Sequence, residues 1–316
     1  MRQSKTLKRF GEGKLARTTC LGHYIPSFLF HAAHNDYDCI WLDLEHRAMS
    51  ELQVQSLLAY SHLFDIDVMV RPPTREKVAL YRYLEEGAAG LLIPHVSTPE
   101  EAEELVAAIK FPPVGERGID NAGLDADYGI HDAANYTAWA NRETFLAVQI
   151  ETPLAVHNAE AIAAVEGVDL IFLGPGDLQL RLDLENQMAL SEAIEIVNNA
   201  CQKAGKPWGC PAPTTEMLTS AHQQGAQLVV ISKESGGWRS ELKRGIDIFA
   251  STCEGGLGPS AMTLSCGTDP QLWHPCCYSK VVCLKTLLLD LSSSAVYYLC
   301  QVDLGFRAVT LKTAAF

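Results

Sequence analysis

Several polar residues with the chemistry of acid–base and metal catalysis closely follow short apolar runs of the chain. Asp43 and His46 come at the end of one run, Arg71 ends the next, and Glu151 and Asp177 follow two later runs. If these runs are parallel strands of one barrel, their carboxyl ends open on the same face. We therefore expect these residues, which lie far apart in the sequence, to meet at one site.

The two acids Glu151 and Asp177 are the candidate metal ligands. Two carboxylates, with water and a chelating substrate in the remaining positions, suit a hard octahedral cation such as Mg²⁺ or Mn²⁺. The alternative interpretation is a pair of solvated acids at the ends of two strands. Residue types alone do not decide between the two.

Asp43 and His46 form the candidate acid–base pair. A carboxylate bonded to an imidazole fixes its tautomer and raises its basicity, so His46 is a candidate general base near neutral pH. The alternative is a structural histidine whose hydrogen bonds are satisfied at a strand end. His95, at the end of the predicted strand 90–96, is the second candidate for the same role.

Arg71 is the candidate group for an anionic substrate, because an arginine at a barrel mouth suits a carboxylate or a developing oxyanion. Pro72 and Pro73 follow it directly and stiffen the chain at that point. The alternative is a salt bridge from Arg71 to a neighbouring acid such as Asp43 or Glu45.

The loop Gly174-Pro175-Gly176 favours a small oxyacid over a nucleotide. It lacks the third glycine of G-x-G-x-x-G and the lysine of a P-loop, whereas glycines permit close backbone approach to a small ligand. No G-x-S-x-G is present, which disfavours a serine hydrolase of the α/β type. His274, Cys276, Cys277 and Cys283 do not have a zinc-site spacing.

The apolar runs alternate with longer amphipathic stretches, a pattern typical of βαβ units. Glycines at 87, 167 and 225 precede three of the runs, as expected of helix ends that lead into strands. Repetition of this unit predicts an α/β (β/α)8 barrel, with a doubly wound open sheet as the alternative. The predicted strands are 17–24, 38–45, 67–72, 90–96, 144–151, 169–173, 207–211 and 227–232, and the predicted helices include 51–63, 99–110, 153–165, 191–204, 214–224 and 238–250.

The composition of the chain changes after about residue 256. Residues 257–316 contain no glutamate but five of the ten cysteines. We predict a catalytic barrel over residues 1–256, closed by the helix 238–250, and an atypical tail over residues 257–316. That tail is either a poorly ordered extension or the product of a mispredicted gene end.

Charge and cysteine usage exclude several classes of function. The 316 residues carry 25 Lys and Arg against 38 Asp and Glu, a net charge of −13, which disfavours binding to nucleic acid. No run of 18 apolar residues predicts a membrane span, and the basic N-terminus lacks the apolar core of a signal peptide. A first helix is favoured there over a mitochondrial presequence. Irregularly spaced cysteines without C-x-x-C indicate reduced thiols in a cytoplasmic protein.

Five motifs in order, "WLDLEHRAMS", "MVRPP", "PPVGERG", "VQIETP" and "FLGPGDL", resemble those of the HpcH/HpaI family of metal-dependent class II aldolases. The resemblance covers about residues 11–250 and implies a barrel of the phosphoenolpyruvate/pyruvate superfamily. Within the family, the chain is most similar to the macrophomate synthase branch. It departs from the family in "SKESGGW" after the eighth strand and in a shortened segment at 120–135.

The resemblance implies roles for the candidate residues. The metal, Mg²⁺ or else Mn²⁺ or Co²⁺, would be held by the two acids and would chelate a 2-oxo acid. Arg71 would stabilise the enolate oxygen, and His46, oriented by Asp43, would act as acid and base. Contacts to the substrate would come from Arg71, Gln149, Gly176 and Asp177, and Tyr136 would face the pocket. The family also implies a homohexamer, a trimer of dimers, with residues 238–250 at an interface.

The reaction implied is decarboxylation of oxaloacetate to a pyruvate enolate, followed by addition to a 2-pyrone or a similar acceptor. The first alternative is retro-aldol cleavage of a 4-hydroxy-2-oxo acid to pyruvate and an aldehyde. A second alternative is a degenerate barrel that binds pyruvate-like ligands without turnover. Imine chemistry would require Lys233, whose neighbours Ser232, Glu234 and Ser235 instead indicate an exposed loop.

Overall fold

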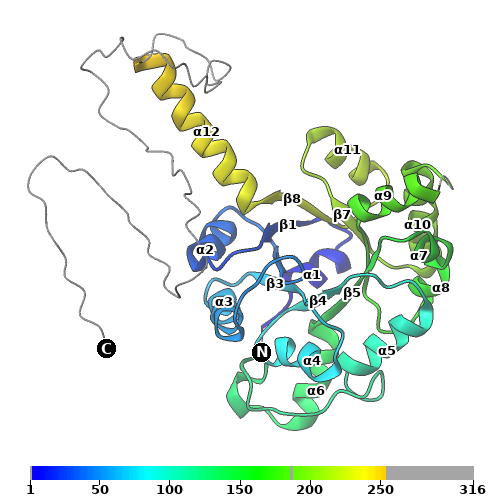
Figure 1. The fold of residues 1–316 in the computed structure, drawn as a ribbon. Helices are drawn as coiled ribbons and strands as arrows, with labels where there is room; N and C mark the ends of the chain where they lie inside the picture. Colours follow the sequence, from blue (N-terminus) through cyan, green and yellow to red (C-terminus); the bar gives the residue numbers. More distant parts are fainter. Residues whose placement is uncertain (1, 186–187, 254–316) are drawn as a thin grey trace, which may run out of the picture. The chain divides into compact units, whose positions relative to one another are not determined.

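The computed structural model describes residues 2–185 and 188–253 (Figure 1). The tail predicted at residues 257–316, and with it the domain boundary at residue 256, lies outside the described residues. The account below concerns the described part of the chain alone.

Eight parallel strands form a closed barrel in which each strand pairs with its neighbours in sequence and β1 pairs with β8 (Figure 1). This closure confirms the predicted (β/α)8 fold and rules out the open sheet. Each of the predicted apolar runs is a strand, with bounds that differ by a few residues. The strands are β1 (Ala16–Leu21), β2 (Cys39–Asp43), β3 (Asp67–Arg71), β4 (Gly90–Ile93), β5 (Phe145–Ile150), β6 (Leu170–Leu173), β7 (Trp208–Pro211) and β8 (Leu228–Lys233).

Helices connect the strands, and most of them begin at a side chain that caps the first turn. Ser50 forms a capping box with Gln53, and Thr98, Asp132 and Thr214 each accept a hydrogen bond from a backbone N–H three residues on. The helices are α1 (Lys5–Gly11), α2 (Pro26–His34), α3 (Glu51–Leu63), α4 (Lys77–Glu85), α5 (Pro99–Ile109), α6 (Ala133–Glu143), α7 (Pro153–His157), α8 (Ala159–Ala164), α9 (Pro175–Glu185), α10 (Leu190–Ala204), α11 (Thr215–Gln223) and α12 (Glu234–Cys253), with a 3₁₀ segment at Leu124–Gly129.

The helix predicted at 153–165 is divided into α7 and α8 at Asn158. The backbone of Asn158 leaves the helical region, and its side-chain amide donates to the backbone oxygen of Ser97 at 2.8 Å. A side chain that bonds outside its own helix competes with helix continuation. The prediction of a single helix at 153–165 is therefore wrong, because the segment forms two helices that meet at Asn158.

Alternation along the strands decides which residues face the inside of the barrel. Trp41, Met69, Ala147 and Phe172 belong to the cluster of buried residues that fills the interior. Side chains two residues further along a strand point to the same side. Asp43, Arg71 and Gln149 therefore lie on the inward face, one layer above this apolar cluster, at the carboxyl ends of the strands.

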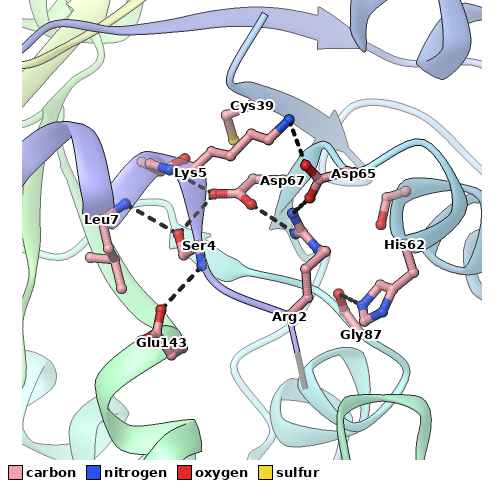
Figure 2. A network of polar contacts seen from close by, with 12 residues as sticks. Arg2, Ser4, Lys5, Leu7, Cys39, His62, Asp65, Asp67, Gly87 and Glu143 are labelled. Carbon is pink, nitrogen blue, oxygen red and sulfur yellow. Dashed lines mark hydrogen bonds and ion pairs between the residues drawn. The ribbon is translucent and has the colours of Figure 1, made fainter. Parts of the chain in front are cut away.

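At the opposite end of the barrel, where β3 begins, the N-terminal segment is bound through the polar network of Figure 2. Asp67, two residues before Met69, is fully buried there. One of its oxygens lies 2.7 Å from the guanidinium of Arg2, and the other accepts from the hydroxyl of Ser4 and the backbone N–H of Thr6, both at 2.8 Å. The basic N-terminal segment thus forms a first helix, α1, that is bound to the barrel.

The last helix differs from its prediction. α12 begins at Glu234, directly after β8, and every side chain from Trp238 to Phe249 is exposed. Leu242, for example, is 75% exposed. Figure 1 shows α12 extending outward from the end of β8. The expectation that this helix closes the barrel within its own chain is therefore wrong.

The described residues bear on two predictions from the sequence, which concern membrane spans and the state of the cysteines. No described helix is both long enough and apolar enough to cross a membrane. Cys20, Cys39, Cys201, Cys210 and Cys253 are free thiols in this part of the chain. Burial raises the pKa of the Cys210 thiol to about 11, which makes it unreactive at neutral pH.

The Asp67 network predicts a large loss of stability on removal of one charge. Asp67→Asn keeps the side chain's size but leaves Arg2 without its buried partner, and we expect a loss of about 3 kcal/mol in the free energy of unfolding. The matched control is Asp65→Asn, because Asp65 is an exposed partner of Arg2 and Lys5. Its cost should stay below about 1 kcal/mol. Urea unfolding followed by circular dichroism measures both, and equal losses would contradict the assignment.

Candidate active site

Arg71 is the central cation of the barrel mouth. The register of β2 and β3 places it opposite Asp43, and its Nε and Nη2 atoms lie 3.0 and 2.9 Å from the two oxygens of that carboxylate. Its Nη1 atom lies 2.9 Å from Glu45, and its guanidinium stacks on the ring of Trp41. The salt bridge considered as an alternative is therefore present, and it fixes the guanidinium in one orientation.

The predicted pairing of Asp43 with the imidazole of His46 is wrong. Both oxygens of Asp43 face Arg71, and only the backbone N–H of His46 contacts the carboxylate, at 3.4 Å. The imidazole lies 3.7 Å from Glu45 instead and is 56% exposed. The register explains the difference, because it brings Arg71 directly beside Asp43 while His46 lies in the loop beyond the strand.

His95 connects two acids of the mouth. It follows β4 in a left-handed backbone conformation, with φ of 59°, which a non-glycine residue adopts at a cost. Its Nδ1 atom lies 2.7 Å from Glu151 and its Nε2 atom 3.1 Å from Glu45. The second candidate histidine thus has closer carboxylate contacts than His46. Its position after an apolar run is the same sequence signal that marked the other residues.

Glu151 is the most buried acid of the site, at 1% exposure. Its Oε1 atom accepts from the backbone N–H of His95 at 2.8 Å, and its Oε2 atom from the amide of Gln149 at 2.6 Å. Burial raises the pKa of Glu151, an effect that His95 opposes and that the charges of Glu45 and Asp177 increase. A cation beside this carboxylate would favour its charged form.

Gly174, which directly follows β6, is required by the packing around Glu151. A Cβ atom at this position would lie 2.6 Å from the Gln149 amide and 2.8 Å from Oε2 of Glu151. The absent side chain therefore makes room for these two groups. Gly176, the predicted substrate contact, is exposed and has open space at its Cβ position.

Asp177 lies in the first turn of α9, exposed at the mouth. Its charge contributes to the raised pKa of Glu151, so the two acids share one electrostatic environment. On the same helix, Arg181 donates to the backbone oxygen of Glu151 at 2.7 Å. The N-terminal half of α9 is thereby fixed to the end of β5.

The donor set of this mouth fits a hard divalent cation. Asp43, Glu45, Glu151 and Asp177 supply an excess of carboxylate over the charge of Arg71. The carbonyl oxygen of buried Gln149 has no hydrogen-bond partner among the described residues. Oxygen ligands of this kind suit Mg²⁺ or Mn²⁺. The fit is therefore one of ligand type, since within residues 2–185 and 188–253 no group of three or more His, Cys, Asp or Glu side chains has the arrangement of a metal site.

Tyr136 does not line the mouth, contrary to prediction. It is fully buried on α6, where its hydroxyl donates to Asp125 at 2.7 Å and accepts from Arg117 at 3.0 Å. Its ring packs edge-on against Phe111. Asp125 and Arg117 satisfy the hydrogen bonds of this hydroxyl, so it belongs to a buried structural network and does not face the mouth.

Comparison with known proteins identifies the family to which this chain is similar. The family described as HpcH/HpaI aldolase/citrate lyase matches residues 23–235. A hydroxypyruvate/pyruvate aldolase of Sagittula stellata is 34% identical over 198 residues, which are 62% of this chain and 78% of that protein. A 5-keto-4-deoxy-D-glucarate aldolase of Shigella boydii is 35% identical over 218 residues, which are 67% and 83% of the two chains.

Solved structures show the same likeness. An HpcH/HpaI aldolase from Desulfitobacterium hafniense has a TM-score of 0.73 and 28% identity, over 77% of this chain and 96% of that one. Macrophomate synthase has a TM-score of 0.69 and 25% identity, over 79% and 89%. The likeness to macrophomate synthase does not exceed that to the Desulfitobacterium protein, so the predicted closeness to that branch is not confirmed.

Because its relatives are named aldolases and its family is one of aldolases and lyases, the chain is a metal-dependent carbon–carbon lyase. More narrowly, the chain belongs to the HpcH/HpaI aldolase/citrate lyase family, which in general depends on a divalent metal.

The position of Tyr136 yields a test that separates structure from catalysis. Tyr136→Phe removes the hydroxyl that joins Asp125 and Arg117, and we expect a loss of about 1–3 kcal/mol in the free energy of unfolding. Because this hydroxyl does not face the mouth, kcat/KM at 25 °C should stay within about twofold of the wild type, a difference below about 0.5 kcal/mol. A large fall in kcat/KM with unchanged stability would contradict this assignment and indicate that Tyr136 contacts the substrate.

Proposed function

We propose that this lyase acts on 2-oxo acids through a pyruvate enolate, with a divalent cation held by Glu151 and Asp177. The observation that carries the proposal is the convergence of both acids with Arg71 at one end of the barrel. The substrate would be a small-molecule 2-oxo acid, and the net charge of −13 disfavours nucleic acid as a partner. A cytoplasmic location stays a prediction.

The cation, when bound, would act as a Lewis acid that withdraws electrons from the 2-oxo group of the substrate. Arg71 then supplies the protein's own stabilisation of the enolate. Its contacts with Asp43 and Glu45 occupy Nε and one hydrogen on each Nη atom, which leaves two N–H donors for the substrate. Because both acids hold the guanidinium in place, little reorganisation is needed as charge develops on the substrate oxygen.

Proton transfer completes the cleavage of a 4-hydroxy-2-oxo acid. A base takes the proton of the 4-hydroxyl group, the C3–C4 bond breaks, and its electron pair forms the enolate as the aldehyde leaves. A proton added to C3 then gives pyruvate. We assign this acid–base role to His46, whose imidazole is exposed at the rim with Glu45 beside it.

Two acceptors remain as candidates for the enolate. The names of the relatives at 34% and 35% identity favour an aldehyde, and hence aldol addition and cleavage. The structural likeness to macrophomate synthase supports the second candidate, in which oxaloacetate loses carbon dioxide to give the same enolate and the enolate adds to a 2-pyrone. Both reactions pass through the same pyruvate enolate, so the cation and Arg71 would have the same roles in each.

We also propose that the chain assembles as a homohexamer, a trimer of dimers, through α12. Trp238, Leu242, Ile246 and Phe249 are exposed and follow one another at intervals of four, four and three residues. This spacing places them on one face of the helix. An exposed apolar stripe of this kind is typical of an interface.

Removal of the metal tests the mechanism. EDTA should eliminate both carbon dioxide release from oxaloacetate and retro-aldol cleavage, and added Mg²⁺ or Mn²⁺ should restore them, because the cation activates the 2-oxo group. Borohydride with pyruvate should leave the protein unlabelled by mass spectrometry. A trapped adduct at Lys233 together with EDTA-resistant turnover would replace this mechanism by imine chemistry.

Variants of the two acids provide the controls. Glu151→Gln and Asp177→Asn should each abolish Mn²⁺ binding, measured by calorimetry, with folding confirmed by circular dichroism. Asp183→Asn is the matched control, because Asp183 is an exposed acid of the same helix that contacts only Gln179 among the described residues. Tight Mn²⁺ binding by the double variant would remove both acids from the metal site. Failure of the wild type to turn over any 2-oxo acid would favour the degenerate barrel.

The assembly is tested by light scattering. The wild type should have the mass of a hexamer, and Leu242→Ser with Ile246→Ser should shift the mass toward that of smaller species, since the apolar stripe is lost. Arg244→Ser, on the opposite side of α12, should leave the mass unchanged. A monomeric wild type, both at full length and in a chain ending at residue 256, would contradict the proposal.

A further inference from the structure

Residues 94–97 form a short segment between β4 and α5 that carries His95 into the mouth. The backbone of His95 is left-handed, with φ of 59°, which costs energy in a residue other than glycine. In this conformation its backbone N–H and its Nδ1 atom both lie against Oε1 of Glu151, at 2.8 and 2.7 Å. Such strain persists only where surrounding contacts hold the chain in place. The segment therefore needs support from outside itself.

Side chains on both sides of the segment supply this support. Arg75, in the loop after β3, donates to the backbone oxygen of Pro94 at 2.6 Å and lies 3.3 Å from Glu101. Glu101, in the first turn of α5, accepts from the backbone N–H of Ser97 at 2.6 Å. The side-chain amide of Asn158 donates to the backbone oxygen of Ser97 at 2.8 Å. Both ends of the segment are thus bonded to side chains from three other parts of the barrel.

The contact from Asn158 interrupts a helix. Asn158 has φ of −91° and ψ of 5°, and it is the residue at which the helix predicted at 153–165 divides into α7 and α8. A residue of higher helix propensity without this outward bond would favour one continuous helix. Beside this break, the hydroxyl of Ser97 lies 2.9 Å from that of Thr152, which caps α7. The local sequence therefore favours the position of residues 94–97 over the continuity of the helix.

We propose that Asn158 and Arg75 are positioning residues, which set the orientation of the Glu151 carboxylate by holding His95 in its strained conformation. The inference rests on the proposed function, in which Glu151 is a ligand of the divalent cation. Both residues act through residues 94–97, and neither forms a hydrogen bond or ion pair with the Glu151 side chain in the described part of the chain. Outer contacts that orient a metal ligand typically change metal affinity by about ten- to a hundredfold.

Asn158→Ala tests the amide contact. The variant should raise the Kd for Mn²⁺ about tenfold by calorimetry, because His95 and Glu151 lose their fixed orientation. Its Tm should change by less than about 3 °C, since alanine favours the helix that Asn158 interrupts. Asn141→Ala is the matched control, because Asn141 is a partly buried asparagine of α6 whose amide donates to the backbone oxygen of Phe111 at 2.9 Å. This control should lower the Tm and leave the Kd unchanged.

Arg75→Met separates position from charge. Loss of a positive charge would by itself strengthen the binding of a cation, whereas loss of the support for residues 94–97 should weaken Mn²⁺ binding about tenfold. Arg75→Lys, which keeps the charge and a hydrogen-bond donor, should restore most of the affinity. Binding of Mn²⁺ by Arg75→Met as tightly as by the wild type, or more tightly, would overturn the role of this residue.

Hydrogen exchange in the metal-free protein gives a readout that does not depend on the cation. The amides of residues 95–97 should exchange about tenfold faster in Asn158→Ala than in the wild type, measured by mass spectrometry, because the segment opens more often when one of its bonds is lost. The amides of α3 should exchange at unchanged rates. Unchanged exchange at residues 95–97, or equal Mn²⁺ affinity of the wild type and both variants, would overturn this inference alone. A wild type that binds no Mn²⁺ would overturn the proposed function and, with it, this inference.

Discussion

The ion pairs of Arg71 with Asp43 and Glu45 are the interaction on which the mouth of this barrel depends. Three charges brought to the inside of a closed sheet lose much of their hydration, a loss that close pairing offsets. The pairing fixes the guanidinium over Trp41 and, through Glu45, reaches His95 and then Glu151. One connected set of charges therefore spans the carboxyl ends of β2, β3, β4 and β5, and the order of the site follows from it.

A division between paired and unpaired charge organises the two halves of the mouth. On the side of β3 to β6, acids outnumber cations, which suits a metal and the 2-oxo acid that it would hold. On the side of β8 and β1, Glu234 accepts from the backbone N–H of Gly22, and Arg47 donates to the backbone oxygen of His46. Neither Arg47 nor Lys233 forms an ion pair with another described residue.

Most of the fold was predictable from the sequence because its signals are local. Apolar runs of four to six residues, capping side chains such as Ser50 and Thr98, and glycines at helix ends each act within a few residues. The predictions that failed were those that required a partner distant in the sequence. The single helix at 153–165 is broken because Asn158 bonds to Ser97, and Tyr136 is turned away from the mouth by Asp125 and Arg117.

The sequence by itself determined the barrel and the residue types at its mouth, because alternation and strand order place Asp43, Arg71, Gln149 and Glu151 on one inward face. Only the tertiary structure decided which of these groups touch. The register of β2 against β3 pairs Asp43 with Arg71, so the imidazole of His46 lies near Glu45 instead. The backbone after β4 places His95 against Glu151. Such choices depend on separations of a few ångströms between strands, and electrostatic energy changes steeply over that distance, so spacing in the chain does not settle them.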